Sequence, residues 1–251
     1  MTGLPAPAIE ISAGREVTCA ITNANDLYCW GLNSVGQMGD TTTVDRWTAT
    51  YAGSYVAHVY VGSLHVCAMQ THGELLCWGG NSRGQVGDGT FVDKHSSTRP
   101  TSPAFAQQLA VGLETTFVRP AADELDCWGS GDGLIYGPSS TDHNQAMAIP
   151  SLSGIADVAL GNYHQCVVIA GGGMKCWGSN AFGQLGDGTK TDNAIPVFVS
   201  GITGRPDQIS MGGNYSCARL GAFVRCWGFN DSGQLGDGTN TSRTVPTAVS
   251  W

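Results

Sequence analysis

The sequence is 251 residues long, rich in glycine (36 residues) and poor in charge, with 13% Asp, Glu, Lys and Arg and a formal net charge of −8. This acidic chain has no basic patch, which excludes nucleic acid and anionic membrane surfaces as favoured partners because both would repel it. There is no run of about 18 apolar residues, so membrane insertion by a helix is excluded as well.

Five repeats of about fifty residues follow one another along the chain. Each contains the tripeptide Cys-Trp-Gly, and successive copies lie 48, 50, 49 and 50 residues apart. In chain order the repeats are centred on Cys29-Trp30, Cys77-Trp78, Cys127-Trp128, Cys176-Trp177 and Cys226-Trp227. We predict that residues 1–251 form a single domain made of these units.

The predicted elements recur in one order. A β segment leads to a glycine, a second segment follows, and a turn precedes the segment that ends in Cys-Trp-Gly. An Asn-x-x-Gly-Gln-x-Gly-Asp motif comes next, then a Thr-rich stretch that runs into an apolar strand such as Ile195–Val199, which opens the next repeat. The glycines are Gly14, Gly62, Gly112, Gly161 and Gly212, and the motifs are Asn33–Asp40, Asn81–Asp88, Asn180–Asp187 and Asn230–Asp237.

These repeats predict an all-β propeller of five blades of about 50 residues. No repeat has helical periodicity. One small sheet cannot bury both of its faces, whereas sheets stacked around an axis cover one another. The terminal segment Val245–Val249 matches Ile195–Val199, and the first repeat lacks such an opening strand. We therefore expect the C-terminal strand to complete the first blade and close the ring.

The motif at Cys176–Thr189 and Cys226–Thr239 resembles the regulator-of-chromosome-condensation repeat family. The resemblance covers the whole chain and implies a β-propeller, although members of that family usually have seven blades. A fragment of a longer ring, or a ring completed by a partner chain, therefore stays open. The resemblance also implies protein binding through loops on one face. Functions in the family include nucleotide exchange on a small GTPase, β-lactamase inhibition and interaction domains of larger proteins.

Eight of the nine cysteines form pairs nine or ten residues apart, each bracketing a turn. Opposed positions on antiparallel strands place two Cβ atoms near the separation that a disulfide needs. We predict one disulfide in each of four blades, in preference to reduced thiols or to zinc, whose usual Cys-x2–4-Cys spacing is absent. The pairs are Cys19/Cys29, Cys67/Cys77, Cys166/Cys176 and Cys217/Cys226.

The predicted disulfides place the protein in an oxidising compartment: extracellular, on the cell surface or in the periplasm. The first residues, MTGLPAPAIE, lack the features of a secretory signal, so we expect a removed signal or another export route. Cys127 is left unpaired because Phe117 occupies its partner position. It is either a free buried thiol or the site of an intermolecular disulfide.

Two recurrent positions are interpreted as structural. The tryptophan of each repeat is expected to pack between blades rather than to stack on sugars, and the motif aspartates Asp40, Asp88, Asp187 and Asp237 to bond their own turns rather than to bind calcium. The position two residues before each first cysteine is held by Val17, His65, Thr115, His164 and Tyr215. These residues form either a ring around the propeller axis or, for the histidines, hydrogen bonds to the backbone of their own blade.

The third repeat departs from the motif and follows a long insertion-like stretch, Phe91–Pro103. Function often lies where a repeat breaks its own rules. We therefore predict partner contacts within Phe91–Pro103 and Gly131–His143. The candidates are Phe91, Lys94, His95, Leu134, Ile135, Tyr136 and His143.

No nucleophile elbow, zinc-protease motif or phosphate-binding loop occurs in the sequence, so we expect neither catalysis nor a metal or cofactor. The leading hypothesis is a secreted, disulfide-stabilised propeller that binds protein or mediates adhesion through loops on one face. The alternative is a structural subunit of an extracellular filament or surface assembly, in which copies bind one another. An enzyme with a site in the axial channel is the least favoured hypothesis, and a small-molecule ligand stays open.

Overall fold

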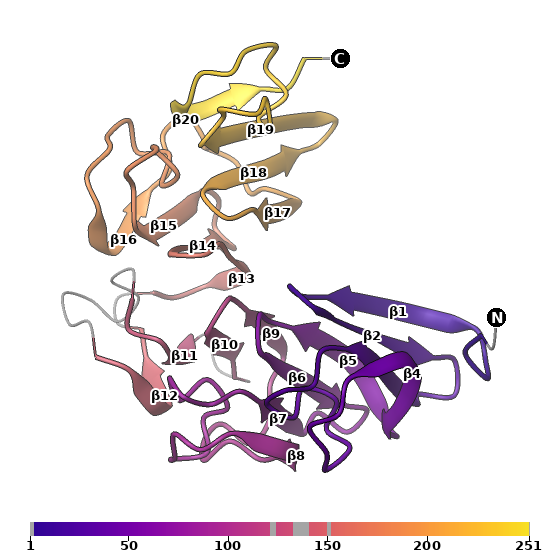
Figure 1. Ribbon diagram of the computed structural model, residues 1–251. Coiled ribbons are helices and arrows are strands. Elements are labelled where there is room, and N and C mark those ends of the chain that lie inside the picture. Colours follow the sequence, from indigo (N-terminus) through magenta and orange to yellow (C-terminus); the bar gives the residue numbers. More distant parts are fainter. Residues whose placement is uncertain (1–2, 121–123, 133–140, 150–151, 251) are drawn as a thin grey trace. The chain divides into compact units, whose positions relative to one another are not determined.

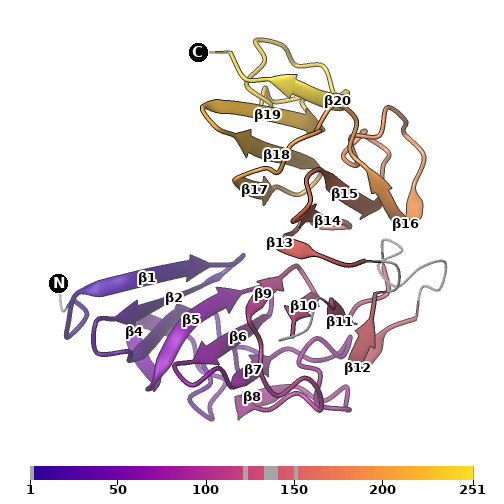
Figure 2. The ribbon, with the colours of Figure 1, turned by 180° about the vertical axis from the view of Figure 1, so that it is seen from behind.

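The protein is all-β. Its computed structural model describes residues 3–120, 124–132, 141–149 and 152–250, and in these ranges it contains twenty strands and no helix. The strands form five four-stranded sheets, each a meander of consecutive strands (Figures 1 and 2). The prediction of five blades is confirmed.

Each sheet contains the four strands of one repeat. The first has β1 (Ala8–Ala13), β2 (Val17–Thr22), β3 (Leu27–Gly31) and β4 (Arg46–Gly53). The second has β5 (Val56–Val61), β6 (His65–Gln70), β7 (Leu75–Gly79) and β8 (Lys94–Thr98). The third has β9 (Gln108–Val111), β10 (Thr115–Arg119), β11 (Asp126–Gly129) and β12 (His143–Ala148). The fourth has β13 (Ile155–Leu160), β14 (His164–Ile169), β15 (Met174–Gly178) and β16 (Asn193–Phe198). The fifth has β17 (Gln208–Met211), β18 (Tyr215–Leu220), β19 (Phe223–Gly228) and β20 (Arg243–Ala248).

The chain divides into two compact units. The first unit contains the first three sheets, and the second unit contains the fourth and fifth. That residues 1–251 act as one domain stays a prediction.

The expectation that the C-terminal strand completes the first blade is wrong. β20 pairs with β19, where Cys226 lies opposite Thr247, so this strand is the outer edge of the fifth sheet. The first sheet is already complete, because Arg46–Gly53 pairs with β3 and supplies its fourth strand. The apolar strand after each Thr-rich stretch therefore folds back on the Cys-Trp-Gly segment of its own repeat rather than opening the next one.

The position of each strand in its sheet explains its composition. The second strands are buried on both faces and read as nearly continuous apolar runs, as in the HVCAMQ segment of β6. The fourth strands are half exposed and tolerate Pro196 and Pro246, because an edge strand can lack one ladder hydrogen bond. In the hairpin between β6 and β7, Gly73 adopts a φ of 87°, which a side chain would strain.

Within each unit the hydrophobic core lies between consecutive sheets. In the first unit, Ile21 and Leu27 of the first sheet pack with Val59 of the second, and Leu75 of the second packs with Leu109 of the third. In the second unit the fourth and fifth sheets share a cluster of the same kind. The repeat glycines permit this close approach: a Cβ added to Gly14 would lie 1.9 Å from the carbonyl oxygen of Gly62.

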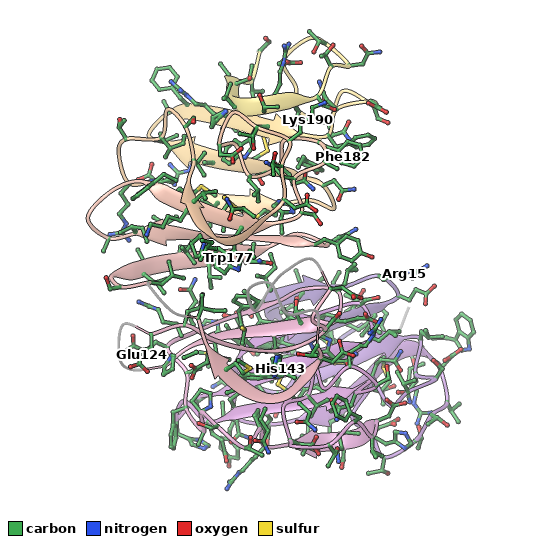
Figure 3. All side chains as sticks on the ribbon, turned by 90° about the vertical axis from the view of Figure 1, so that its left-hand side faces the viewer. Arg15, Glu124, His143, Trp177, Phe182 and Lys190 are labelled. Atoms are coloured by element: carbon green, nitrogen blue, oxygen red, sulfur yellow. A yellow bond between two sulfur atoms is a disulfide. The ribbon has the colours of Figure 1, made fainter. Side chains whose placement is uncertain are left out.

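The four predicted disulfides are present, each inside one sheet (Figure 3). Each joins directly opposed residues of the second and third strands, with Cα atoms 4.1 Å apart. In the third sheet Phe117 lies opposite Cys127, as the alignment of the repeats predicts. Cys127 is a free, buried thiol, and burial raises its pKa well above the usual value.

Removing one cross-link should destabilise the protein measurably. We expect the double substitution Cys166→Ala/Cys176→Ala to lower the free energy of unfolding by about 2–3 kcal/mol in urea, because a ten-residue loop is no longer closed in the unfolded chain. The control is the same pair of proteins in reductant, where most of the difference should disappear. Equal stability under oxidising conditions would show that this disulfide is not formed.

Candidate functional site

Four long loops, each beginning at the motif asparagine, connect the third and fourth strands and are held by their own side chains. In the first loop, the side-chain amide of Asn33 donates to the carbonyl oxygens of Thr42 and Val44, both at 3.1 Å, and its Oδ1 accepts the amide of Met38 at 2.9 Å. The same bonds recur at Asn81, Asn180 and Asn230. We call residues 33–45, 81–93, 180–192 and 230–242 the motif loops. Figure 3 labels Phe182 and Lys190 of the third of these.

The motif aspartates stabilise these loops, as predicted. Asp40 accepts the backbone amide of Thr42 at 3.0 Å and its hydroxyl at 2.7 Å, and it pairs with Arg46. Burial alone would raise the pKa of Asp40, but the bonds from Thr42 and Arg46 outweigh burial and lower it. Asp88 is bound in the same way by Thr90 and Lys94, whose Nζ lies 2.5 Å away, and its pKa is lowered too.

Three of the repeat tryptophans hold their sheet against the motif loop of the preceding repeat. The indole Nε1 of Trp78 donates to the carbonyl oxygen of Gln37 at 2.9 Å. Trp128 and Trp227 make the same bond to Gln85 and Gln184, at 2.8 and 2.9 Å. The prediction that the tryptophans pack between blades is confirmed for these three contacts, which we call joints.

A buried histidine strengthens two of the joints. In the joint of the second and third sheets, Thr116 donates its hydroxyl hydrogen to the carbonyl of Gln85 at 2.9 Å, so its oxygen must accept the Nε2 hydrogen of His65 at 3.0 Å. In the joint of the fourth and fifth sheets, Ser216 and His164 repeat this arrangement. The expectation that these histidines bond the backbone of their own blade is wrong, because their partners lie one repeat further along the chain.

The buried histidines are neutral. Burial lowers the pKa of His65 to about 3 and of His164 to about 4, since the Nδ1 atom of each ring is buried and has no hydrogen-bond partner. Val17 and Thr115, at the equivalent positions, are also buried, and Tyr215 is half-buried. That these five positions form an axial ring stays a prediction.

The predicted partner-contact residues differ in exposure. Phe91 is 49% exposed and His95 is exposed, whereas Lys94 and His143 are half-buried and Lys94 is paired with Asp88. Leu134, Ile135 and Tyr136 lie outside the described residues. The sequence analysis missed Val44 (60% exposed) on the first motif loop. It also did not single out Val92 (66% exposed), which lies within the predicted stretch Phe91–Pro103 and takes the equivalent place in the second motif loop.

Among the described residues, no group of three or more His, Cys, Asp or Glu side chains could hold a metal ion. The same part of the chain contains no helix long and apolar enough to cross a membrane. The polar side chains that recur most regularly, those of the motif loops and joints, bind other groups of the protein.

Two family models match the chain, and both describe the regulator of chromosome condensation (RCC1) repeat. One matches residues 172–219 and 224–251, and the other matches 8–37, 56–85 and 155–184. The chain belongs to the RCC1 repeat family. Residues 86–154, which include the irregular third repeat, lie outside these matches.

Two curated relatives are similar to most of this RCC1-repeat chain. Human E3 ubiquitin-protein ligase HERC2 is 28% identical over 222 residues, covering 83% of this chain and 5% of that protein. The ultraviolet-B receptor UVR8 of Arabidopsis thaliana is 28% identical over 223 residues, covering 87% of this chain and 40% of the receptor. The chain therefore spans less than half the length of either relative.

Solved structures share the fold at low sequence identity. Human WBSCR16 superposes with a TM-score of 0.86 at 21% identity, covering 97% of this chain and 67% of that one. Prp20p of Saccharomyces cerevisiae superposes with a TM-score of 0.84 at 18% identity, covering 97% of this chain and 63% of that one. Both likenesses establish the RCC1-like propeller fold.

Acid should destabilise the protein through the two buried histidines. The unfolded chain binds protons near pH 6.5, whereas the folded pKa values are about 3 and 4, so stability should fall as the pH drops from 6.5 toward 4. The expected loss is on the order of 2–3 kcal/mol per histidine. The variant His65→Val/Thr116→Val, which copies the natural Val17/Val66 pair of the first joint, should lose about half of this pH dependence in urea titrations. An unchanged dependence would contradict the assignment.

A second pH effect should come from the last motif loop. Hydrogen bonds from Thr239 and Arg243 lower the pKa of Asp237 to about 2, so its contribution to stability is present above about pH 4 and is lost as the pH falls toward 2. Asp237→Asn should therefore lower the melting temperature at pH 7, with a difference that narrows in acid. Asp187→Asn is the matched control, since Asn193 stands where Arg243 does, and its effect should be smaller.

Proposed function

We propose that this protein is a protein-binding propeller that presents its motif loops to a partner, in an oxidising compartment such as the periplasm or the extracellular space. The observation that carries the proposal is the pair of exposed apolar tips, Val44 on the first motif loop and Phe91-Val92 on the second. Exposed apolar side chains that gather on one kind of rigid loop are typical of protein interaction sites.

The rigidity of these loops supports binding. The Asn33 and Asn81 networks satisfy the polar groups inside each loop, so little conformational entropy remains to be lost when a partner docks. The equivalent tips of the fourth and fifth repeats are Thr191 and Thr241, which are exposed and polar. The apolar tips therefore belong to the first two repeats and do not follow from the repeat pattern.

The relatives support binding rather than catalysis. Prp20p binds Gsp1p and histones, and another solved structure shows yeast RCC1 bound to Kap60. The RCC1-like region of HERC2 is a small part of a ubiquitin ligase. These partners belong to those proteins. For the present chain we carry over only the use of the propeller as a binding surface, with adhesion as one form of it.

The disulfides support the proposed compartment. Four cross-links persist only where thiols are not kept reduced, which supports export from the cytosol. Partners are therefore expected among exported or surface proteins of the source organism.

The proposal predicts that binding depends on the apolar tips. The wild type and the variant Val44→Glu/Phe91→Glu/Val92→Glu are immobilised and exposed to the secreted and surface proteins of the source organism. The amount of any specifically bound protein recovered on the variant should be at least tenfold lower than on the wild type. This factor corresponds to about 1.4 kcal/mol, which is modest for buried apolar contacts at an interface.

The matched control is Thr191→Glu/Thr241→Glu, which adds charge at the equivalent loop positions of the last two repeats. It should bind like the wild type, and both variants should keep the wild-type melting temperature because all five side chains are exposed. Equal recovery by the wild type and the tip variant would contradict the proposal.

A further inference from the structure

A pocket of about 230 Å³ lies between the first and second sheets, inside the first unit. One wall comes from β3, β4 and the link that follows β4, and the other comes from β6, β7 and β8. The pocket lies at the end of the first sheet where Leu27 is opposite Gly53, whereas the motif loop joins the strands at the other end, where Gly31 is opposite Arg46. It is therefore separate from the motif loops.

The pocket exists because one wall of the first sheet departs from the repeat. In the fourth sheet, Val199 donates its amide to the carbonyl oxygen of Met174 and packs in the core with an exposed fraction of 3%. In the first sheet a β-bulge puts Ala52 and Gly53 at this place, opposite Leu27. Two small residues thus stand where a branched side chain fills the joint of the fourth and fifth sheets.

A strained tyrosine lies on the rim of the pocket. Tyr55 is 69% exposed and has a φ of 60°, a conformation that few residues other than glycine adopt. Its carbonyl oxygen accepts the amide of Thr71 at 2.7 Å. Gly154 holds the same place in the fourth repeat, with a φ of 64° and a bond of 2.6 Å from the Ala170 amide. The fold needs only glycine here, and strain that the fold does not need is typical of functional positions.

The pocket also offers polar groups that are not used within the protein. Ser54 and Gln70 are half-buried and Ser97 is exposed, and none of these three side chains is hydrogen-bonded to another residue in the part of the chain that the structure describes. The described residues that line the pocket include no Asp, Glu, Lys, Arg or His. A charged ligand would therefore find no opposite charge there.

These features match a neutral sugar ring. The pocket is smaller than the roughly 300 Å³ at which sites for drug-sized ligands begin, so it suits a single ring. The C–H groups of a pyranose pack on the electron-rich face of an aromatic side chain such as Tyr55. Its hydroxyls both donate and accept, as the amide of Gln70 and the serine hydroxyls require. A wholly apolar ligand would leave those groups unpaired.

We propose that the pocket between the first and second sheets binds one neutral hexopyranose. The sugar ring packs on Tyr55, and its hydroxyls bond Ser54, Gln70 and Ser97. The ring is either a free sugar or the end of a longer glycan, since both present the same chemistry. This inference goes beyond the proposed function, because the site lies away from the apolar tips of the motif loops.

Titration followed by NMR of the backbone amides tests the proposal. The probes are the methyl glycosides of glucose, galactose and mannose, each as both anomers. We expect at least one of them to bind with a Kd of about 1–10 mM, the range of a weak single-ring contact, and to shift the amide signals of Tyr55, Gln70 and Ser97.

Three variants separate the parts of the site. Tyr55→Gly copies Gly154, so it should fold normally and bind at least about tenfold more weakly. Tyr55→Phe keeps the aromatic ring and should stay within about threefold of the wild type. Ala52→Val narrows the pocket and should also weaken binding. The matched control is Tyr163→Ala in the second unit, where Tyr163 is 45% exposed, and it should bind like the wild type.

Absence of binding by all six methyl glycosides at about 50 mM, well above the expected Kd, would overturn the proposal. Unchanged binding by Tyr55→Gly would also overturn it, as would tighter binding of a methyl glucuronide or of benzyl alcohol than of any neutral glycoside. Tighter binding of the matching disaccharide would identify the ligand as the end of a glycan, and equal binding would identify it as a free sugar. The triple loop-tip variant should bind sugar like the wild type, so failure here and failure of the proposed function are distinguishable.

Discussion

The fold depends on one hydrogen bond, from a tryptophan indole to the backbone carbonyl of a glutamine in the preceding repeat. The acceptor is a main-chain atom, so the loop that carries it must be held in place, and the asparagine and aspartate networks of the motif loops hold it. The glycine two residues after the glutamine lets the indole approach closely. The conspicuous residues of the repeat thus act together in the three joints, where each packs one sheet against its neighbour within a unit.

The disulfides play a separate and more dispensable part. Each staples the two central strands of one sheet, whereas the joints connect different sheets. The third sheet shows that a joint does not require a disulfide. It has Phe117 opposite the free Cys127, yet Trp128 still donates to the carbonyl oxygen of Gln85. A buried phenylalanine can replace a cross-link inside a sheet, because apolar packing also holds two strands together. Nothing replaces the indole in the three joints.

The sequence predicted contacts between residues that are close in the chain. It did not predict contacts between residues that lie one repeat apart. The cysteine pairs were predictable because a tight turn fixes the register of residues ten apart, such as Cys67 and Cys77. The partner of His65 is Thr116, 51 positions further on, and no local pattern indicates it. The likeness of Val245–Val249 to Ile195–Val199 established that the two segments are equivalent, but not which strand each segment pairs with. The sequence therefore assigned the C-terminal strand to the wrong sheet.

The residues that recur in every repeat carry little information about function. Positions that recur in every repeat are occupied by the scaffold, and their polar groups are satisfied inside it, so the most conspicuous residues say least about partners. Information about binding lies in positions that the scaffold leaves unconstrained. Val44 and Val92 differ from Thr191 and Thr241 although the loops that carry them make the same hydrogen bonds.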